Sequence, residues 1–282
     1  MTVHMMNQRA YTSIAAIAIV LGLMLCAAPH RVLADDPPAI HQSAIPADQI
    51  PPYLTDAINS PARPAADRES DTSRQPAQVM AFFGIKPGMQ VADLWAGGGS
   101  TTELLARIVG PSGKVYSQNT AFPEKFKKNE AAWQARLKEP GMGNVVEVTK
   151  PFGAPDMIPV PPNTLDVVLI NLNYHDLFDV GADPEKFNAI VFKALKPGGV
   201  YGIVDNSAQA GSGTRDTDTL HRIDEDFVIK QIHKAGFRLV AFSDVLSNPK
   251  DPRTEPFWKM DHMQDRFILK FVKPITLAGS AH

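Results

Sequence analysis

The sequence has almost no cysteine. Its 282 residues contain a single one, Cys26, and this residue lies in an N-terminal segment that we expect to be removed from the mature protein. Disulfides, thiolate metal sites and a cysteine nucleophile are then all excluded. A chain of this length can be stable without such cross-links because it can bury a large apolar core.

An excess of charge of one sign is also missing. The chain has 28 Lys and Arg against 30 Asp and Glu, a formal net charge of −2. Proteins that bind nucleic acid usually carry a net positive charge or a basic face. We therefore expect no nucleic-acid partner.

Long hydrophobic runs are absent after residue 30, so we expect no membrane span in the mature chain. The composition of 44% hydrophobic and 21% charged residues is ordinary for a folded protein. The length admits one large domain or two small ones.

Residues 1–34 have the layout of a secretory signal peptide. Arg9 precedes an uncharged apolar run of about fifteen residues, Ile14 to Ala28, and Val32-Leu33-Ala34 offers a small residue at the cleavage position. The run is shorter than the ~20 residues of a spanning helix, although an uncleaved anchor is the alternative. We expect a periplasmic or secreted protein.

The mature chain divides into three parts. Residues 35–75 are rich in Pro and Ala and are expected to form an arm, with one short helix near 52–59; residues 76–275 are expected to form the main domain, and 276–282 a tail. In the main domain, apolar strand patterns alternate with helical ones. The expected strands are 91–94, 114–117, 145–148, 165–172, 200–204, 238–243 and 265–272. The alternation predicts an α/β, Rossmann-like fold, a mostly parallel seven-stranded sheet with helices on both faces.

A glycine turn follows the first of these strands. Gly97, Gly98 and Gly99 lie between the strand and a segment, Ser100 to Glu103, that has the spacing of a capping box at the start of a helix. Such a turn exposes backbone N–H groups to a carboxylate or phosphate, and glycine permits close approach. A dinucleotide fingerprint fails here, because Thr102 stands at the third glycine position and the next strand ends in amides. An NAD-linked oxidoreductase is accordingly disfavoured.

The segment Val91 to Ser100, VADLWAGGGS, resembles the first motif of class I S-adenosylmethionine-dependent methyltransferases. More narrowly, residues 71–274 resemble a bacterial group of exported "predicted methyltransferases", through segments such as LDVVLINLNYHDLF, LKPGGVYGIVDNSAQAGSG and SNPKDPRTEPFWKMDHMQDRFILKF. The resemblance implies S-adenosylmethionine as cofactor and leaves the substrate unidentified.

Several cofactor-binding positions are implied by this resemblance. Asp93 would organise the methionine end of the cofactor above Gly97, Gly98 and Gly99. Two departures from the family pattern are visible. Trp95 stands where many methyltransferases have their first glycine, and an amide, Gln118 or Asn119, replaces the acid that normally holds the ribose hydroxyls. Asp156 lies near the usual adenine-side acid, with Ala154 at the more typical position.

The end of the fourth strand is the expected reaction edge. It is followed by the run Asn171 to Phe178, which includes Tyr174, His175 and Asp176, where the resembling enzymes place substrate-orienting residues. His175 is the candidate general base, because an imidazole titrates near neutral pH, and Asp176 is its candidate orienting partner or a helix N-cap. A structural role for His175 is the alternative. Asn171 is open between ligand contact and turn formation.

Two later segments are candidates for covering the site. Residues 208–214 are small and are expected to form a mobile loop, and the apolar residues of 248–263 could roof a substrate pocket or pack against the sheet edge. His221 to Asp224 are expected on a helix spanning 218–235, either facing the site or solvated. The histidines do not fall at metal-ligand spacing, so we expect no metal site.

Two functions remain open at this point. The first is methyl transfer from S-adenosylmethionine to a small-molecule substrate by an exported protein. The second is a non-catalytic periplasmic module that binds a small ligand on the same fold, and the export signal, Trp95 and Asn119 favour it. The sequence does not indicate an oligomeric state.

Overall fold

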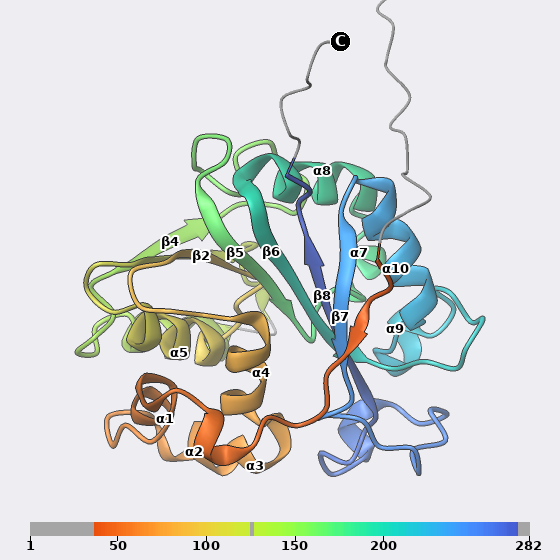
Figure 1. Cartoon of the computed structure of the whole chain (residues 1–282), viewed down its shortest axis with the longest axis horizontal. Coiled ribbons are helices and arrows are strands. Elements are labelled where there is room, and N and C mark those ends of the chain that lie inside the picture. The colour runs from red at the N-terminus through yellow and green to blue at the C-terminus, as the bar shows by residue number, and fades with distance from the viewer. Residues whose placement is uncertain (1–36, 125–126, 276–282) are drawn as a thin grey trace, which may run out of the picture. The chain divides into compact units, whose positions relative to one another are not determined.

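A single eight-stranded sheet organises the chain. The computed structural model describes residues 37–124 and 127–275. The strand order is β1-β7-β8-β6-β5-β2-β3-β4, and β8 runs antiparallel to both of its neighbours while the other pairs are parallel (Figure 1). The strands are β1 (Ile40–His41), β2 (Gln90–Leu94), β3 (Lys114–Asn119), β4 (Val145–Thr149), β5 (Leu165–Asn171), β6 (Leu195–Asn206), β7 (Arg238–Ser243) and β8 (Arg266–Val272).

The expected fold class is confirmed, and the strand count is corrected from seven to eight. All seven predicted strands are present, and β1 is added by the segment that we expected to be an arm. Ile40 pairs with Ala241 and His41 with Phe242, parallel to β7. Because β7 would otherwise be an open edge with unpaired backbone groups, even a two-residue strand covers part of that edge.

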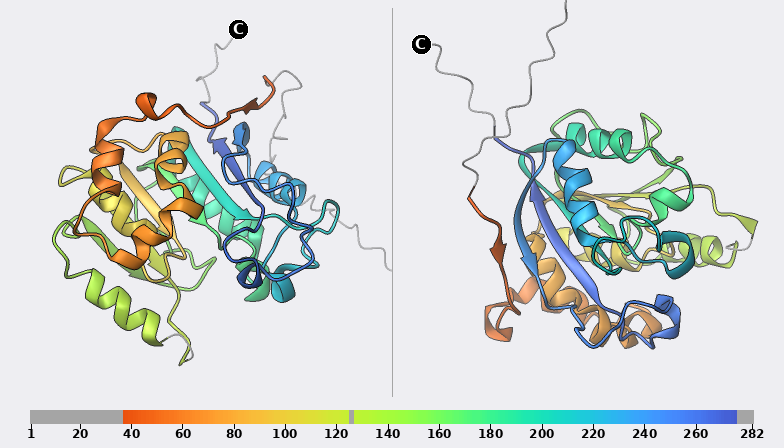
Figure 2. Two further views of the ribbon diagram at one scale, coloured as in Figure 1. Left: turned by 90° about the horizontal axis from the view of Figure 1, so that it is seen from below. Right: turned by 90° about the vertical axis from the view of Figure 1, so that its right-hand side faces the viewer.

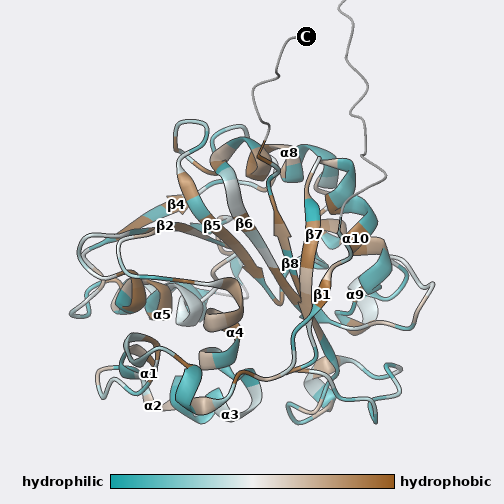
Figure 3. Cartoon of the chain, viewed as in Figure 1, coloured by the Kyte–Doolittle hydropathy of each residue, from teal (hydrophilic) through white to brown (hydrophobic). Residues whose placement is uncertain are grey.

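Helices cover both faces of the sheet (Figure 2). On one face Leu54, Phe83, Leu105 and Trp133 belong to one buried cluster, and on the other Phe187, Val191, Val228 and Ile232 belong to a second. The helices of the first face are α1 (Pro52–Ile58), α4 (Pro76–Phe83), α5 (Ser100–Val109) and α6 (Lys127–Arg136); those of the second are α7 (Asp176–Asp179), α8 (Pro184–Ala194) and α10 (Glu225–Lys234). The central strands β2 and β5 are largely apolar (Figure 3), as expected of strands buried on both faces.

The expected arm packs on the domain through both apolar and ionic contacts. Leu54 of α1, the helix expected near 52–59, is fully buried. Two short helices follow, α2 (Ala65–Glu69) and α3 (Asp71–Arg74), and Asp67 of α2 pairs with Arg136 at 2.6 Å. Arg136 also pairs with the buried Glu103 of α5. Burial works to lower the pKa of Arg136. The hydrogen bonds and negative charges of Asp67 and Glu103 outweigh burial and hold this pKa above its usual value.

The capping box predicted at the start of α5 is wrong. Gly99 occupies the N-cap position and no side chain caps the helix. Ser100 Oγ instead lies 3.2 Å from a guanidinium nitrogen of Arg74. Glu103 cannot turn back to the N-cap because its carboxylate is held by Arg107 and Arg136.

The single helix predicted over residues 218–235 is also wrong. The chain forms α9 (Thr217–Leu220) and α10, and His221 between them takes a left-handed conformation with φ 49°. Ile223 pairs with the end of β6, where its N–H donates to the carbonyl of Asn206 at 3.0 Å. The Asp224 carboxylate then caps α10 by accepting from the N–H of Asp226. This pairing and the new cap end the first helix after one turn.

Within the described part of the chain, no helix is both long enough and apolar enough to cross a bilayer. The predicted signal peptide, residues 1–34, and the predicted tail, 276–282, lie outside the described residues.

Candidate functional site

The glycine turn between β2 and α5 has two glycines that are open to a ligand and one that is not. A Cβ placed on Gly97 or Gly98 would have no atom within 4 Å. A Cβ on Gly99 would lie 2.3 Å from the indole of Trp133. Gly97 and Gly99 both have positive φ, at 56° and 83°. Gly99 is therefore required for packing, whereas Gly97 and Gly98 leave the backbone accessible.

The two amides at the end of β3 brace this turn. Asn119 accepts a hydrogen bond from the N–H of Gly97 at 2.8 Å, and its amide nitrogen lies 3.3 Å from the Gly97 carbonyl. Gln118 accepts from the N–H of Trp95 and donates to the carbonyl of Lys150. Both side chains are buried. The hydrogen bonds that Gln118 and Asn119 make within the chain explain why amides stand where the family pattern has an acid. Ribose binding by either residue remains a prediction.

Asp93 lies beneath the turn. Its carboxylate accepts a hydrogen bond from Thr102 Oγ1 at 2.6 Å, and Thr102 also contacts Ser117. Burial raises the pKa of Asp93 to about 7, against the opposing effect of the Thr102 hydrogen bonds. The structure thus places Asp93 as a support that links β2, β3 and α5.

Trp95 turns away from the open glycines. It has φ 55°, a conformation that glycine adopts more readily than a bulky residue. Its indole lies against Phe152, with ring centroids 4.1 Å apart, and the Trp95 carbonyl accepts from Asn173. Because nothing lies within 4 Å of the Cβ positions of Gly97 and Gly98, the indole does not fill the space over them.

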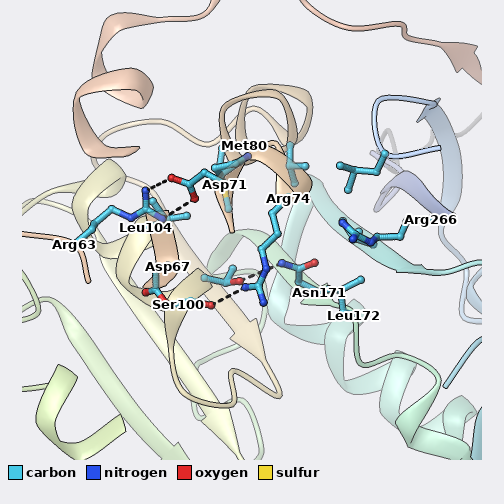
Figure 4. A pocket seen from close by; sticks show the side chains of 15 residues that line it. Arg63, Asp67, Asp71, Arg74, Met80, Ser100, Leu104, Asn171, Leu172 and Arg266 are labelled. Atoms are coloured by element: carbon cyan, nitrogen blue, oxygen red, sulfur yellow. Dashed lines mark hydrogen bonds and ion pairs between the residues drawn. The ribbon is translucent and has the colours of Figure 1, made fainter. Parts of the chain in front are cut away.

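A pocket opens at the N-terminus of α5 (Figure 4). Ser100, Thr101 and Asn171 line one side, where Asn171 donates to Thr101 Oγ1 at 3.1 Å, and Arg74 of α3 and Arg266 of β8 point into it. The pKa of Arg266 is lowered to about 10, mainly by burial and to a smaller extent by repulsion from the charge of Arg74.

This pocket has the electrostatics of an anion site. The two nearby carboxylates are already paired, Asp71 with Arg63 and Asp67 with Arg136. Among the described residues, neither Arg74 nor Arg266 has an ion pair with a carboxylate. Two cations and a helix N-terminus therefore face the same space, an arrangement that favours a bound carboxylate.

The loop after β5 brings a second group of polar side chains together. His175 Nδ1 lies 2.7 Å from Asp205 Oδ1, and the N–H of His175 donates to the other carboxylate oxygen at 2.9 Å. His175 Nε2 lies 3.1 Å from His221 Nδ1 and 3.4 Å from Asp176 Oδ1. Asp205 is thus the partner that orients His175, and Asp176 lies on the opposite side of the ring.

Both ring nitrogens of His175 already have partners, and the residue is 1% exposed. Burial opposes protonation, but the charge and hydrogen bond of Asp205 raise the pKa of His175 to about 9. An imidazole in this setting has no free nitrogen directed at a substrate, which weakens the case for His175 as a general base. That role remains a prediction.

Two predicted site residues lie elsewhere. Tyr174 is fully buried and its hydroxyl accepts from Asn188, in a core network that includes Tyr201. Burial raises the pKa of Tyr174 well above its usual value. Asp156 lies on the surface, 2.5 Å from Lys150, and the hydrogen bond from Lys150 lowers its pKa.

Sequence reasoning missed three residues of these two groups, Arg74, Asp205 and Arg266, whereas His221 was expected on a helix that either faces the site or is solvated. Only Asp205 gave a usable signal, because it lies near the carboxyl end of a predicted strand beside the one that precedes His175, where parallel strands of an α/β sheet meet a ligand. Arg74 lies in the expected arm and Arg266 lies at the start of a predicted strand, and nothing in the local pattern marks either of them as a site residue.

Comparison with known proteins agrees with this architecture. No protein-family model matches the chain. Over 117 residues it is 31% identical to the ubiquinone/menaquinone biosynthesis C-methyltransferase UbiE of Pasteurella multocida, covering 41% of this chain and 39% of that protein. It is 27% identical over 137 residues to a demethylmenaquinone methyltransferase of Geobacillus stearothermophilus, covering 49% and 53%. The chain therefore spans about half or less of the curated relatives it matches.

Solved structures extend the similarity to most of the chain. A SAM-dependent methyltransferase from Aquifex aeolicus superposes with a TM-score of 0.54 at 23% identity, covering 74% of this chain and 95% of that one. The cyclase SpnF also reaches 0.54, at 16% identity, covering 79% and 92%.

The fold is that of the class I S-adenosylmethionine-dependent methyltransferases, and the resemblance expected from residues 91–100 is confirmed. Within that class, the sequence similarity is to quinone-pathway C-methyltransferases over part of their length. The narrower resemblance to an exported group remains a prediction.

Proposed function

We propose that this protein binds S-adenosylmethionine at the glycine turn and transfers its methyl group to a small-molecule acceptor. The observation that carries the proposal is the open backbone of Gly97 and Gly98 at the carboxyl end of β2, beside a pocket lined by two arginines that have no carboxylate partner among the described residues. Ligands of open α/β sheets bind at this edge, where the strand order reverses. The partial similarity to C-methyltransferases supports the same cofactor.

The residues of the pocket suit the amino-acid end of that cofactor. A carboxylate at the N-terminus of α5 would meet the guanidinium of Arg74 and the backbone N–H groups of the first helical turn. The adenosyl portion would then extend over Gly97 and Gly98 toward the ends of β3 and β4, where Phe152 and Trp95 offer apolar surface.

The acceptor belongs at the carboxyl end of β5. In the transfer, the sulfonium–methyl bond breaks as a bond forms between the methyl carbon and the acceptor atom. The sulfur keeps the bonding electron pair and S-adenosylhomocysteine leaves. A proton is released only if the acceptor atom carried one. Alignment of donor and acceptor supplies most of the catalysis in such a displacement.

The location of the protein is part of the proposal. The charge, apolar run and small residues of 1–34 support export to the periplasm or beyond. A fractionation experiment on cells that produce the full chain tests this: a shorter protein in the periplasmic or secreted fraction supports it, and an uncleaved protein in the cytosol contradicts it.

Ligand binding is the direct test of the cofactor. We expect S-adenosylmethionine and S-adenosylhomocysteine, but not NAD, to raise the melting temperature, since a ligand at a hundred times its Kd stabilises a protein by about 2.7 kcal/mol. Stabilisation by NAD alone would overturn the proposal. Binding of the adenosyl ligands without turnover on any acceptor would support the alternative of a non-catalytic binding module.

A further inference from the structure

Three potential metal ligands from two distant segments converge at the end of β5. They are His175 Nε2, Asp176 Oδ1 and His221 Nδ1, which all lie within 4.8 Å of one another. We propose that these three residues bind a divalent transition-metal ion, with zinc as the best-fitting candidate. The site is separate from the glycine turn, and the inference does not rest on the proposed cofactor.

The spacing of the donor atoms fits one ion. The two nitrogens are 3.1 Å apart, and Asp176 Oδ1 is 3.4 Å from His175 Nε2 and 3.5 Å from His221 Nδ1. Ligands with bonds of about 2.0–2.1 Å in tetrahedral geometry are separated by about 3.3–3.4 Å. The separations of the three donor atoms therefore match those of ligands to one ion.

The donor set selects the class of metal. Two imidazoles and one carboxylate suit zinc and iron, whereas calcium and magnesium prefer oxygen ligands alone. Three protein ligands leave at least one position for water or another molecule, as in catalytic rather than structural zinc sites.

Asp205 supplies the supporting contact that metal-binding histidines usually have. When its carboxylate accepts the Nδ1 proton of His175, Nε2, which lies beside His221 and Asp176, is free to bind an ion that displaces the Nε2 proton and leaves the ring neutral. The same carboxylate also accepts from the backbone N–H of His175, so the ring is held in place by two bonds to one buried residue.

His221 is held in position by an unusual backbone conformation. Its φ of 49° is uncommon for a residue with a side chain, and its carbonyl accepts a hydrogen bond from the buried Asn206. Strained residues of this kind gather at functional sites. The break between α9 and α10 is what brings this imidazole to His175.

The site can be reached from solvent. The side chain of His221 is 36% exposed and that of Asp176 is 16% exposed. Phe257 and Trp258, from the segment expected either to roof a substrate pocket or to pack against the sheet edge, lie beside His221 with ring centroids 6.1 and 5.3 Å away. An ion here would have an open coordination position next to apolar surface, suited to an acceptor that carries an oxygen donor.

A bound ion would also decide the role of His175. Its Nε2 would be a ligand and could not take a proton from a substrate. The ion itself could polarise an oxygen of the acceptor and lower the pKa of a hydroxyl group there. The hydroxyl would then lose its proton without a general base.

Titration of the chelator-treated full chain with ZnCl₂ in an isothermal calorimeter tests the proposal. We expect one ion per chain, and with CoCl₂ the intense visible absorption of a four-coordinate site. Because His175 is buried and His175→Ala could unfold the protein, the informative variants are His221→Ala and Asp176→Asn, each expected to weaken zinc binding at least about a hundredfold. Asp205→Asn should weaken it by about tenfold to a hundredfold.

His41→Ala is the matched control. His41 lies 3.2 Å from Asp244 on the surface and is another exposed histidine–carboxylate pair, outside the cluster. Its substitution should leave zinc binding unchanged. No zinc binding, or equal affinity in His221→Ala, Asp176→Asn and the parent chain, would overturn the proposal. Because no cofactor is present in the titration, these outcomes do not depend on S-adenosylmethionine binding.

Discussion

His175 Nε2 lies 3.1 Å from His221 Nδ1, although 46 positions separate the two residues in the chain. His175 follows β5, and His221 follows α9 beside the extended end of β6. Because β5 and β6 are parallel neighbours, their carboxyl ends lie at the same edge, and the turn after α9 brings His221 to that edge, where its carbonyl accepts from Asn206. The proposed metal site therefore depends on both the strand order and the break between α9 and α10.

Gly98→Ala and Gly99→Ala should have opposite consequences. A methyl group on Gly98 meets nothing in the protein, so stability should change little while cofactor binding weakens, because the backbone is no longer open. A methyl group on Gly99 collides with Trp133 at 2.3 Å, and overpacking of this kind costs about 1–3 kcal/mol.

Urea unfolding and calorimetric titration with S-adenosylmethionine, made on both variants, separate the two effects. If Gly98→Ala bound the cofactor as tightly as the parent chain, the turn would not be the cofactor site.

Arg74→Ala should weaken S-adenosylmethionine binding by about tenfold to a hundredfold, the loss expected for a hydrogen bond to a charged group. The guanidinium of Arg74 faces the N-terminus of α5 and has no carboxylate partner among the described residues. Lys193→Ala, on the exposed surface of α8, removes an equal charge and should have no effect. An unchanged Kd for Arg74→Ala would place the cofactor carboxylate elsewhere.

Asp93 should make the protein less stable as the pH rises from about 4 to 7. Burial raises its pKa from 3.8 to about 7, so across this range the folded chain keeps a proton that the unfolded chain has lost. The stability contributed by the protonated group is complete below pH 4 and is lost progressively up to pH 7, above which neither the folded nor the unfolded chain binds the proton.

The free energy of unfolding of Asp93→Asn, measured by urea titration at several pH values, should lack this decline. Asp156→Asn is the control, because Asp156 is exposed and its pKa is lowered rather than raised. The same decline in Asp93→Asn as in the parent chain would show that another group is responsible.

Arg136→Met should destabilise the protein by about 3 kcal/mol, because it leaves the carboxylates of Asp67 and Glu103 without their shared partner. Glu103 is the more affected of the two, since it is almost fully buried and keeps only Arg107. The exposed pair Lys127–Glu130 provides the comparison, and Lys127→Ala should cost less than about 1 kcal/mol. Equal midpoints of urea unfolding for the two variants would contradict this account.

The glycine turn could be predicted from the sequence, but the contacts that its individual residues make could not. The motif from Asp93 to Ser100 identified the class of fold and the carboxyl edge of the sheet. Gly99 is needed because Trp133 packs against it, and Trp133 lies on α6, which follows α5 and β3 in the chain. Asn119, expected at the ribose, bonds to both backbone groups of Gly97. These contacts depend on how β3 and α6 pack, which the local pattern does not contain.

The sequence by itself determined the alternation of strands and helices, because hydrophobic periodicity and turn residues act over a few neighbouring positions. It also determined that glycines and His175 follow the ends of buried strands. Tertiary structure decided which distant side chains meet: Arg74 with Ser100, Asp205 with His175, and His221 with both His175 and Asp176. The physical reason is that a pocket's charge and a metal's ligands come from segments that only strand pairing and helix packing bring within a few ångströms.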